Sequence, residues 1–94
     1  MHKIERDLES MYYLYRHLCE DTLIPFYIGI GIKRKFHSAT IQSEYERAYN
    51  FNSRSGYWKN VYNKHGCVVE ILYESNNREE IGMKLDLLKL KNFM

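Results

Sequence analysis

The stretch MYYLYRHLCEDTLIPFYIGIG, residues 11–31, decides the fold because it holds two aromatic-rich runs joined by a short polar link. The first run, MYYLYRHL, alternates roughly as a half-buried strand does, so we predict a strand from about residue 11 to residue 18. CEDTLIP is predicted to turn the chain, and Pro25 precedes a second strand, FYIGIG. Gly29 and Gly31 weaken the interior of that strand and allow another group to approach its backbone closely. Two strands with so short a connection indicate an antiparallel hairpin.

The segment after the hairpin has little periodicity. Residues 32–46 begin with basic side chains and show no clean period, so we expect helical turns and loop there. The phrase RAYNF, residues 47–51, begins or continues a helix. A helix over about 56–64 follows, and either Ser53 or Ser55 caps its start.

The C-terminal third predicts one more strand and one more helix. Gly66 ends the preceding helix, and CVVEILY, residues 67–73, alternates as a third strand. Asn76 or Asn77 then caps a helix over residues 78–90, whose acidic first turn lies at the favourable end of the helix dipole. The order of elements predicts one small α/β domain, of the α+β kind, over residues 1–94. Its three-stranded sheet is either mixed or antiparallel.

Composition limits the class of protein without naming a partner. The chain has 94 residues, of which 45% are apolar, and this is enough core for one small domain. A net charge of +2 permits contact with a polyanion but does not require it. Cys19 and Cys67 are too few for a disulfide framework, and the sequence has no Cys/His cluster at zinc-ligand spacing. With no apolar run of membrane-spanning length and no signal peptide, we expect a soluble protein of the cytoplasm.

Tyr15 on the first predicted strand and Tyr27 on the second are candidates for a paired-hydroxyl site. If both project from one face beside Arg34, Arg47 or Arg54, the set suits a phosphate diester. Arginine binds phosphate through two parallel hydrogen bonds, and an activated water or phenolate can serve the attack. The competing interpretation is that these are ordinary core tyrosines and loop arginines.

The phrases YLY at 13–15 and FYIG at 26–29 resemble the paired strand motifs of the GIY-YIG nuclease domain, in its small stand-alone form known from phages and bacteria. The resemblance covers about residues 11–92, with about 38–52 as its variable part. The later motifs come in the family's order: the basic KRKFH segment, the W-K-x-x-x-x-K-x-G phrase, the VVEIL strand and an EE…LDLL helix. The resemblance implies a three-stranded antiparallel sheet flanked by helices. It also implies an enzyme that hydrolyses DNA phosphodiester bonds with one Mg²⁺ or Mn²⁺ ion. A phage protein in its host's cytoplasm fits this expectation.

The resemblance assigns a role to each motif residue. Tyr15 matches the tyrosine that acts as general base or orients water, and Tyr27 matches the one that donates hydrogen bonds within the site. The family's arginine stabilises charge on the scissile phosphate. We expect Arg34 in that role, with Arg47 as the alternative and His37 as a companion that transfers a proton or holds a phosphate.

Further basic residues are candidates for contacts with the DNA backbone: Lys33, Lys35, Arg54, Lys59 and Lys64. A solvated, charged surface explains these residues equally well. The expected partner is DNA, with no membrane contact, and the protein is either a monomer or a homodimer.

The family's metal ligand is a glutamate on the last helix, and aligning the apolar residues 85–88 places Lys84 at that position. An ammonium repels a cation instead of binding it, so three interpretations remain. The chain is an inactive copy whose Lys84 binds phosphate, Glu80 one turn earlier has taken over metal binding, or the alignment is shifted and Asp86 is the nearest acid. The expected function is therefore a metal-dependent DNA endonuclease, inactive if Lys84 replaces its ligand. The alternative is a non-catalytic DNA-binding or interaction module of the same fold.

Overall fold

The computed structural model describes residues 11–33 and 44–92 of the chain. The described part contains these strands and helices: β1 (Tyr12–Leu18), β2 (Pro25–Ile32), α3 (Glu46–Tyr49), α4 (Gly56–His65), β3 (Val68–Ser75) and α5 (Arg78–Asn92). The three predicted strands and the two longer predicted helices are all present, and α3 overlaps the RAYNF region, which it enters from Glu46. Most of the predicted helical turns over 32–46 lie outside the described residues. No described helix has the length and apolar character needed to cross a membrane.

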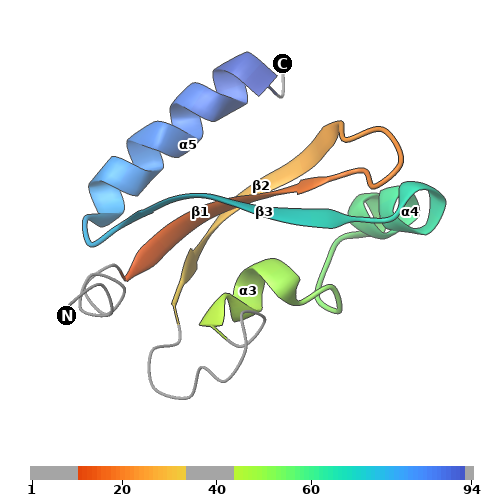
Figure 1. Cartoon of the computed structure of the whole chain (residues 1–94), viewed down its shortest axis with the longest axis horizontal. Helices are drawn as coiled ribbons and strands as arrows, with labels where there is room; N and C mark the ends of the chain where they lie inside the picture. The colour runs from red at the N-terminus through yellow and green to blue at the C-terminus, as the bar shows by residue number, and fades with distance from the viewer. Residues whose placement is uncertain (1–10, 34–43, 93–94) are drawn as a thin grey trace.

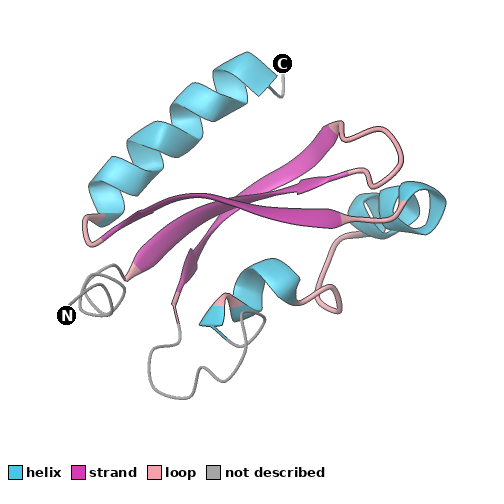
Figure 2. Cartoon of the chain, viewed as in Figure 1, coloured by secondary structure: helices cyan, strands magenta, loops and turns pink. Residues whose placement is uncertain are grey.

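The three strands form one antiparallel sheet in the order β2-β1-β3, with β1 at its centre (Figure 1). This confirms the hairpin and decides for an antiparallel sheet over a mixed one. Tyr15 pairs with Gly29 on one side and Ile71 on the other, so these residues lie side by side across the sheet. Helix α5 lies along one face of the sheet and α3 lies on the opposite face (Figure 2). The fold is a small α+β sheet covered by helices.

Both faces of β1 are buried, because side chains along a strand point alternately to its two faces. On the α3 side, Tyr13 and Tyr15 are fully buried and pack against Ala48. On the α5 side, Leu14 packs against Ile81. A strand buried on both faces has no polar side, which explains why MYYLYRHL shows only rough alternation.

The glycines of β2 make room for the tyrosine rings of β1. A Cβ atom on Gly29 would lie 2.7 Å from the Tyr15 hydroxyl oxygen, and one on Gly31 would collide with Cζ of Tyr13. Neither position has room for a side chain unless the neighbouring ring moves. The predicted close approach to the strand backbone is confirmed, and the approaching groups are the aromatic rings of the neighbouring strand.

The helix ends are set by local capping residues. Ser55, one of the two predicted caps, accepts a hydrogen bond from the Trp58 amide at 3.1 Å at the start of α4. At the start of α5, Oδ1 of Asn77 accepts the Glu79 amide at 2.9 Å. Gly66 follows α4 with a φ of 74°, a backbone conformation that glycine adopts without strain. The capping alternatives are thus decided for Ser55 and Asn77.

Candidate functional site

The two tyrosines singled out from the sequence project from the same face of the sheet, and an arginine lies over them. The ring centroids of Tyr15 and Tyr27 are 6.1 Å apart. The guanidinium carbon of Arg54 is 5.1 Å from the Tyr27 ring centroid and 5.9 Å from that of Tyr15. Among the described residues, the arginine over the tyrosine pair is therefore Arg54, one of the three arginines that the sequence offered beside it and also a predicted DNA contact.

Arg54 is held in place by three hydrogen bonds. Its Nε donates to the Asn50 carbonyl at 2.9 Å, and its Nη2 donates to the Arg47 carbonyl at 2.5 Å. Its Nη1 donates to the Tyr15 hydroxyl at 3.3 Å, and the ring of Trp58 lies 5.7 Å away. A guanidinium group has five N–H donors, so two remain for a ligand. The side chain is thus fixed before any ligand arrives.

Tyr15 lies between the sheet and Arg54, and its hydroxyl contacts Arg54 instead of solvent. Its side chain is fully buried, so it touches no substrate in this conformation. Burial raises the pKa of its phenol, although the hydrogen bond from Arg54 opposes this shift. The phenol therefore stays protonated at neutral pH. This arrangement favours a positioning role for Tyr15 over the predicted role of general base, whereas Tyr27 is half-buried and reaches the surface.

His17 completes the buried layer under Arg54, and the sequence did not single it out. The Trp58 indole N–H donates to its Nδ1 at 2.9 Å, so the ring proton is on Nε2, which donates to the Ala48 carbonyl at 2.7 Å. Burial lowers the pKa of His17 to about 4; the hydrogen bond to Ala48 opposes this shift and the charge of Arg54 adds to it. The ring is neutral at pH 7. Its two-residue spacing from Tyr15 on the strand was the available clue to its position.

Arg47, the alternative arginine of the sequence analysis, lines a small cavity together with Arg54. This cavity has a volume of about 90 Å³, and Asn50 and Ser53 complete its lining. A wider cavity of about 600 Å³ is lined by residues of β2 together with Glu46, Arg47 and Asn50. Two guanidinium groups, a carboxamide and a hydroxyl are groups that donate hydrogen bonds to phosphate oxygens. The arrangement is suited to binding an anion.

Lys84 does not share this site, because α5 covers the other face of the sheet (Figure 1). Ile81 and Leu85 of α5 pack with Leu14, whose side chain points away from the face that carries Tyr15. The sequence alignment that placed residue 84 in one site with the tyrosines is therefore corrected. Packing of α5 against the opposite face is a long-range feature that the motif order does not contain.

Glu80, the proposed substitute metal ligand, has both carboxylate oxygens engaged. The Tyr73 hydroxyl donates to Oε2, and the Ser75 hydroxyl donates to Oε1 at 2.8 Å. These bonds lower the pKa of Glu80, and the charge of Lys84 contributes. The Lys84 ammonium lies 4.6 Å from the Tyr73 ring centroid, so its position is explained by a cation–π contact. Asp86 is exposed on the same helix.

Lys33, predicted to contact DNA, is instead part of the interior. Its side chain is 1% exposed, and its ammonium lies 3.0 Å from a Glu74 oxygen and 3.2 Å from a Glu44 oxygen. Burial alone would lower the pKa of Lys33, but the interactions with the two glutamates outweigh burial and raise it. A buried, doubly paired lysine does not reach a DNA backbone, which corrects the prediction for this residue.

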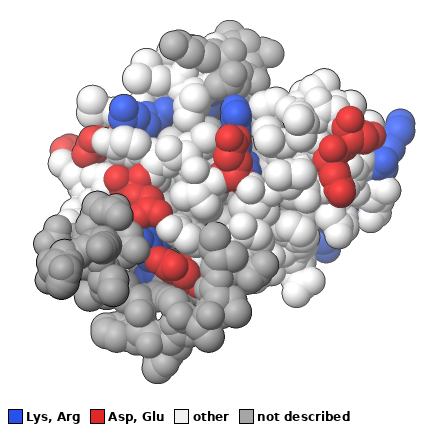
Figure 3. All heavy atoms as spheres, viewed as in Figure 1, with Lys and Arg blue, Asp and Glu red and all other residues white. Residues whose placement is uncertain are grey.

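The other predicted basic contacts divide into two groups. Lys59 and Lys64 are exposed on α4, whereas Lys35 lies outside the described residues. Arg34, the expected site arginine, and His37, its expected companion, lie outside the described residues as well. On the face shown in Figure 3, Lys and Arg atoms are interspersed with Asp and Glu atoms. The described part of that face therefore carries no broad surface of one sign.

Comparison of the chain with models of known families, with curated proteins and with solved structures finds no match.

Proposed function

We propose that the chain is a non-catalytic DNA-binding module with a GIY-YIG nuclease-like fold, which binds backbone phosphates through Arg47 and Arg54. The observation that carries this proposal is the guanidinium group of Arg54, fixed by three hydrogen bonds beside the cavity that it shares with Arg47. Preorganised guanidinium groups bind phosphate with less loss of side-chain freedom than mobile ones do. The proposed likeness to the GIY-YIG nuclease domain is supported by the YLY and FYIG motifs, which lie on the paired strands β1 and β2.

The surroundings of the tyrosine pair favour binding without metal-dependent cleavage. Mg²⁺ and Mn²⁺ require oxygen ligands, usually from one or two carboxylates. Among the described residues, the side chains that lie against the two tyrosine rings are apolar or aromatic ones, His17 and Arg54, and none of these is a carboxylate. Glu80 belongs to the opposite face and is bonded to Tyr73 and Ser75. The described residues in contact with the tyrosine pair thus supply no carboxylate ligand for the family's metal ion, and we derive no catalytic step through it.

A metal-dependent endonuclease is the second candidate, because Tyr15, Tyr27 and Arg54 share one face as that chemistry requires. This candidate needs a carboxylate at the tyrosine face. Glu46 lines the wider cavity beside Arg47 and is the described residue suited to that role. Nicking of supercoiled plasmid in Mg²⁺ or Mn²⁺, with Glu46→Gln as the test of this ligand, separates the two candidates. We expect no nicking by the natural chain, and metal-dependent nicking that Glu46→Gln abolishes would establish the endonuclease.

The binding proposal is tested by fluorescence anisotropy with a short labelled DNA duplex. Arg47→Ala and Arg54→Lys should each weaken binding about tenfold, because each removes a bidentate phosphate contact. Arg78→Ala is the matched control. This exposed arginine belongs to α5, which lies on the face of the sheet opposite Tyr15 and Arg54. Equal losses in all three variants would overturn the proposal. Arg54→Lys keeps the charge, so its loss reports on guanidinium geometry.

A further inference from the structure

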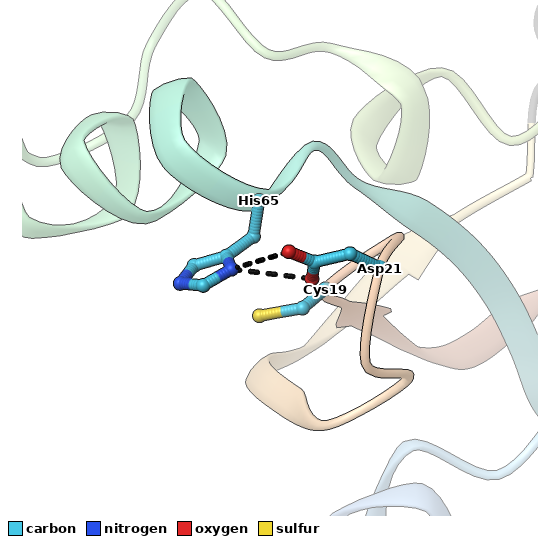
Figure 4. Close-up of side chains that lie close together, drawn as sticks. All are labelled: Cys19, Asp21 and His65. Carbon is cyan, nitrogen blue, oxygen red and sulfur yellow. Dashed lines mark hydrogen bonds and ion pairs between the residues drawn. The ribbon is translucent and has the colours of Figure 1, made fainter.

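Three potential metal ligands, two from the connection between β1 and β2 and one from the end of α4, meet at the end of the sheet next to α4. Cys19 follows β1, Asp21 lies in the turn toward β2, and His65 is the last residue of α4 (Figure 4). One donor atom from each residue lies within 4.8 Å of the other two. Nδ1 of His65 is 2.9 Å and 3.1 Å from the two carboxylate oxygens of Asp21. The sulfur of Cys19 extends toward the side of the His65 ring (Figure 4).

The backbone holds these donors together independently of their side chains. The Glu20 amide, between Cys19 and Asp21, donates to the His65 carbonyl at 3.0 Å. The Cys19 amide donates to the carbonyl of residue 24 at 2.8 Å, which closes the turn. Gly66 allows the Glu20 side chain to pack on it, because a Cβ there would lie 2.6 Å from a Glu20 carboxylate oxygen. The turn and the end of α4 thus form one preorganised unit.

We propose that Cys19, Asp21 and His65 bind one divalent transition-metal ion of the zinc class. A thiolate, an imidazole nitrogen and a carboxylate oxygen suit Zn²⁺, whereas Mg²⁺ and Ca²⁺ prefer oxygen ligands alone. Two nitrogen or oxygen donors about 2.1 Å from a shared ion, at the tetrahedral angle, lie about 3.4 Å apart. The His65 and Asp21 donors, now hydrogen-bonded at 2.9 and 3.1 Å, need to separate by only a few tenths of an ångström to hold an ion between them. Three protein ligands leave a fourth position for water.

Metal binding at this site would add a second link between the β1–β2 turn and α4, which the Glu20 backbone hydrogen bond already joins. When the ion binds, the Cys19 S–H bond breaks, its proton passes to solvent, and a sulfur–metal bond forms. The ion also replaces the proton that Nδ1 of His65 donates to Asp21. An imidazolium releases this proton to solvent, whereas a neutral imidazole loses it from Nδ1 and takes one from solvent at Nε2. In both cases Nδ1 then supplies its lone pair to the ion. The site shares no residue with the lining of the Arg47 and Arg54 cavity, so metal binding and the proposed DNA binding are tested by different substitutions.

Titration of the reduced protein with Co²⁺, used as a spectroscopic substitute for Zn²⁺, tests the proposal. We expect one equivalent to bind, with a near-ultraviolet thiolate-to-cobalt band that added Zn²⁺ removes. Cys19→Ser should abolish the band. Asp21→Asn and His65→Gln should weaken Co²⁺ binding by at least about tenfold. The matched control is Cys67→Ser, which removes the other cysteine and should leave the band intact.

Asp21 is exposed, so Asp21→Asn tests the site even if the buried Cys19 does not tolerate substitution. A rise in melting temperature on adding Zn²⁺, absent in Asp21→Asn, is the second expected readout. Failure of the natural chain to bind one equivalent of Co²⁺ or Zn²⁺ would overturn the proposal. A cobalt band that survives Cys19→Ser and disappears in Cys67→Ser would overturn it as well.

Discussion

The Nη1 of Arg54 lies 3.3 Å from the hydroxyl of the fully buried Tyr15. This contact joins a residue of the central strand to the loop before α4, and it sets the height of the guanidinium group above the sheet. A tyrosine that positions an arginine has a different mutational signature from a tyrosine that activates water. Removing its hydroxyl should lower both the free energy of unfolding and the affinity for DNA, each by about the contribution of one hydrogen bond.

Tyr15→Phe should therefore lower the free energy of unfolding by about 1 kcal/mol, because it removes the acceptor of the Arg54 bond and retains the ring. It should also weaken DNA binding modestly. Tyr12→Phe on the same strand is the control, since Tyr12 lies on the opposite face from Arg54. Urea unfolding followed by circular dichroism measures both variants. Indistinguishable unfolding free energies for the two would argue against the positioning role.

Gly31→Ala should destabilise the protein by about 1–3 kcal/mol, because its Cβ would collide with the Tyr13 ring. Gly56→Ala, at the start of α4, is the matched control, because no atom lies within 4 Å of the position that its methyl group would take. Thermal unfolding should show a lower melting temperature for Gly31→Ala alone. A melting temperature unchanged by Gly31→Ala would mean that the tyrosine rings do not pack on β2.

His17 should make the protein sensitive to acid. Its pKa is about 4 in the folded chain and about 6.5 when unfolded, so the unfolded chain binds the proton more tightly. The stability that depends on neutral His17 is complete above pH 6.5 and is lost as the pH falls toward 4. The loss should reach about 3 kcal/mol. Urea unfolding at several pH values should show a weaker dependence for His17→Gln; an equal dependence would contradict this assignment.

Lys84→Glu should not create a nuclease, because α5 lies on the face of the sheet opposite Tyr15. The natural chain and the variant should give the same result with supercoiled plasmid in Mg²⁺ or Mn²⁺. The substitution places a carboxylate beside Glu80 and removes the cation over the Tyr73 ring, so we expect a small loss of stability. Metal-dependent nicking by the variant alone would show that residue 84 belongs to the active site after all.

Local features of this fold could be predicted from the sequence. The strand of residues 11–18, the cap at Ser55 and the stop at Gly66 depend on neighbours a few positions away, and all three are confirmed. The close approach at Gly29 and Gly31 was also predictable, since glycine in a strand signals it.

Long-range placement could not be predicted in the same way. The face that α5 covers depends on packing between distant segments. The sequence alignment does not contain this information, and it therefore placed Lys84 in one site with the tyrosines by mistake. Arg54 reaches Tyr15 from an irregular loop whose path follows no sequence period. Cys19 and His65 meet because a turn packs on a helix end, whereas their spacing in the sequence matches no zinc motif.

The salt dependence of DNA binding tests the central claim most directly. Each phosphate contact releases condensed counterions, so the slope of log affinity against log salt reports the number of contacts. Arg47→Ala should reduce the magnitude of this slope by about 1, and Arg78→Ala should leave it unchanged. Such a difference would show that Arg47 neutralises a phosphate beside Arg54. Identical slopes for the natural chain and Arg47→Ala would contradict the proposed phosphate site.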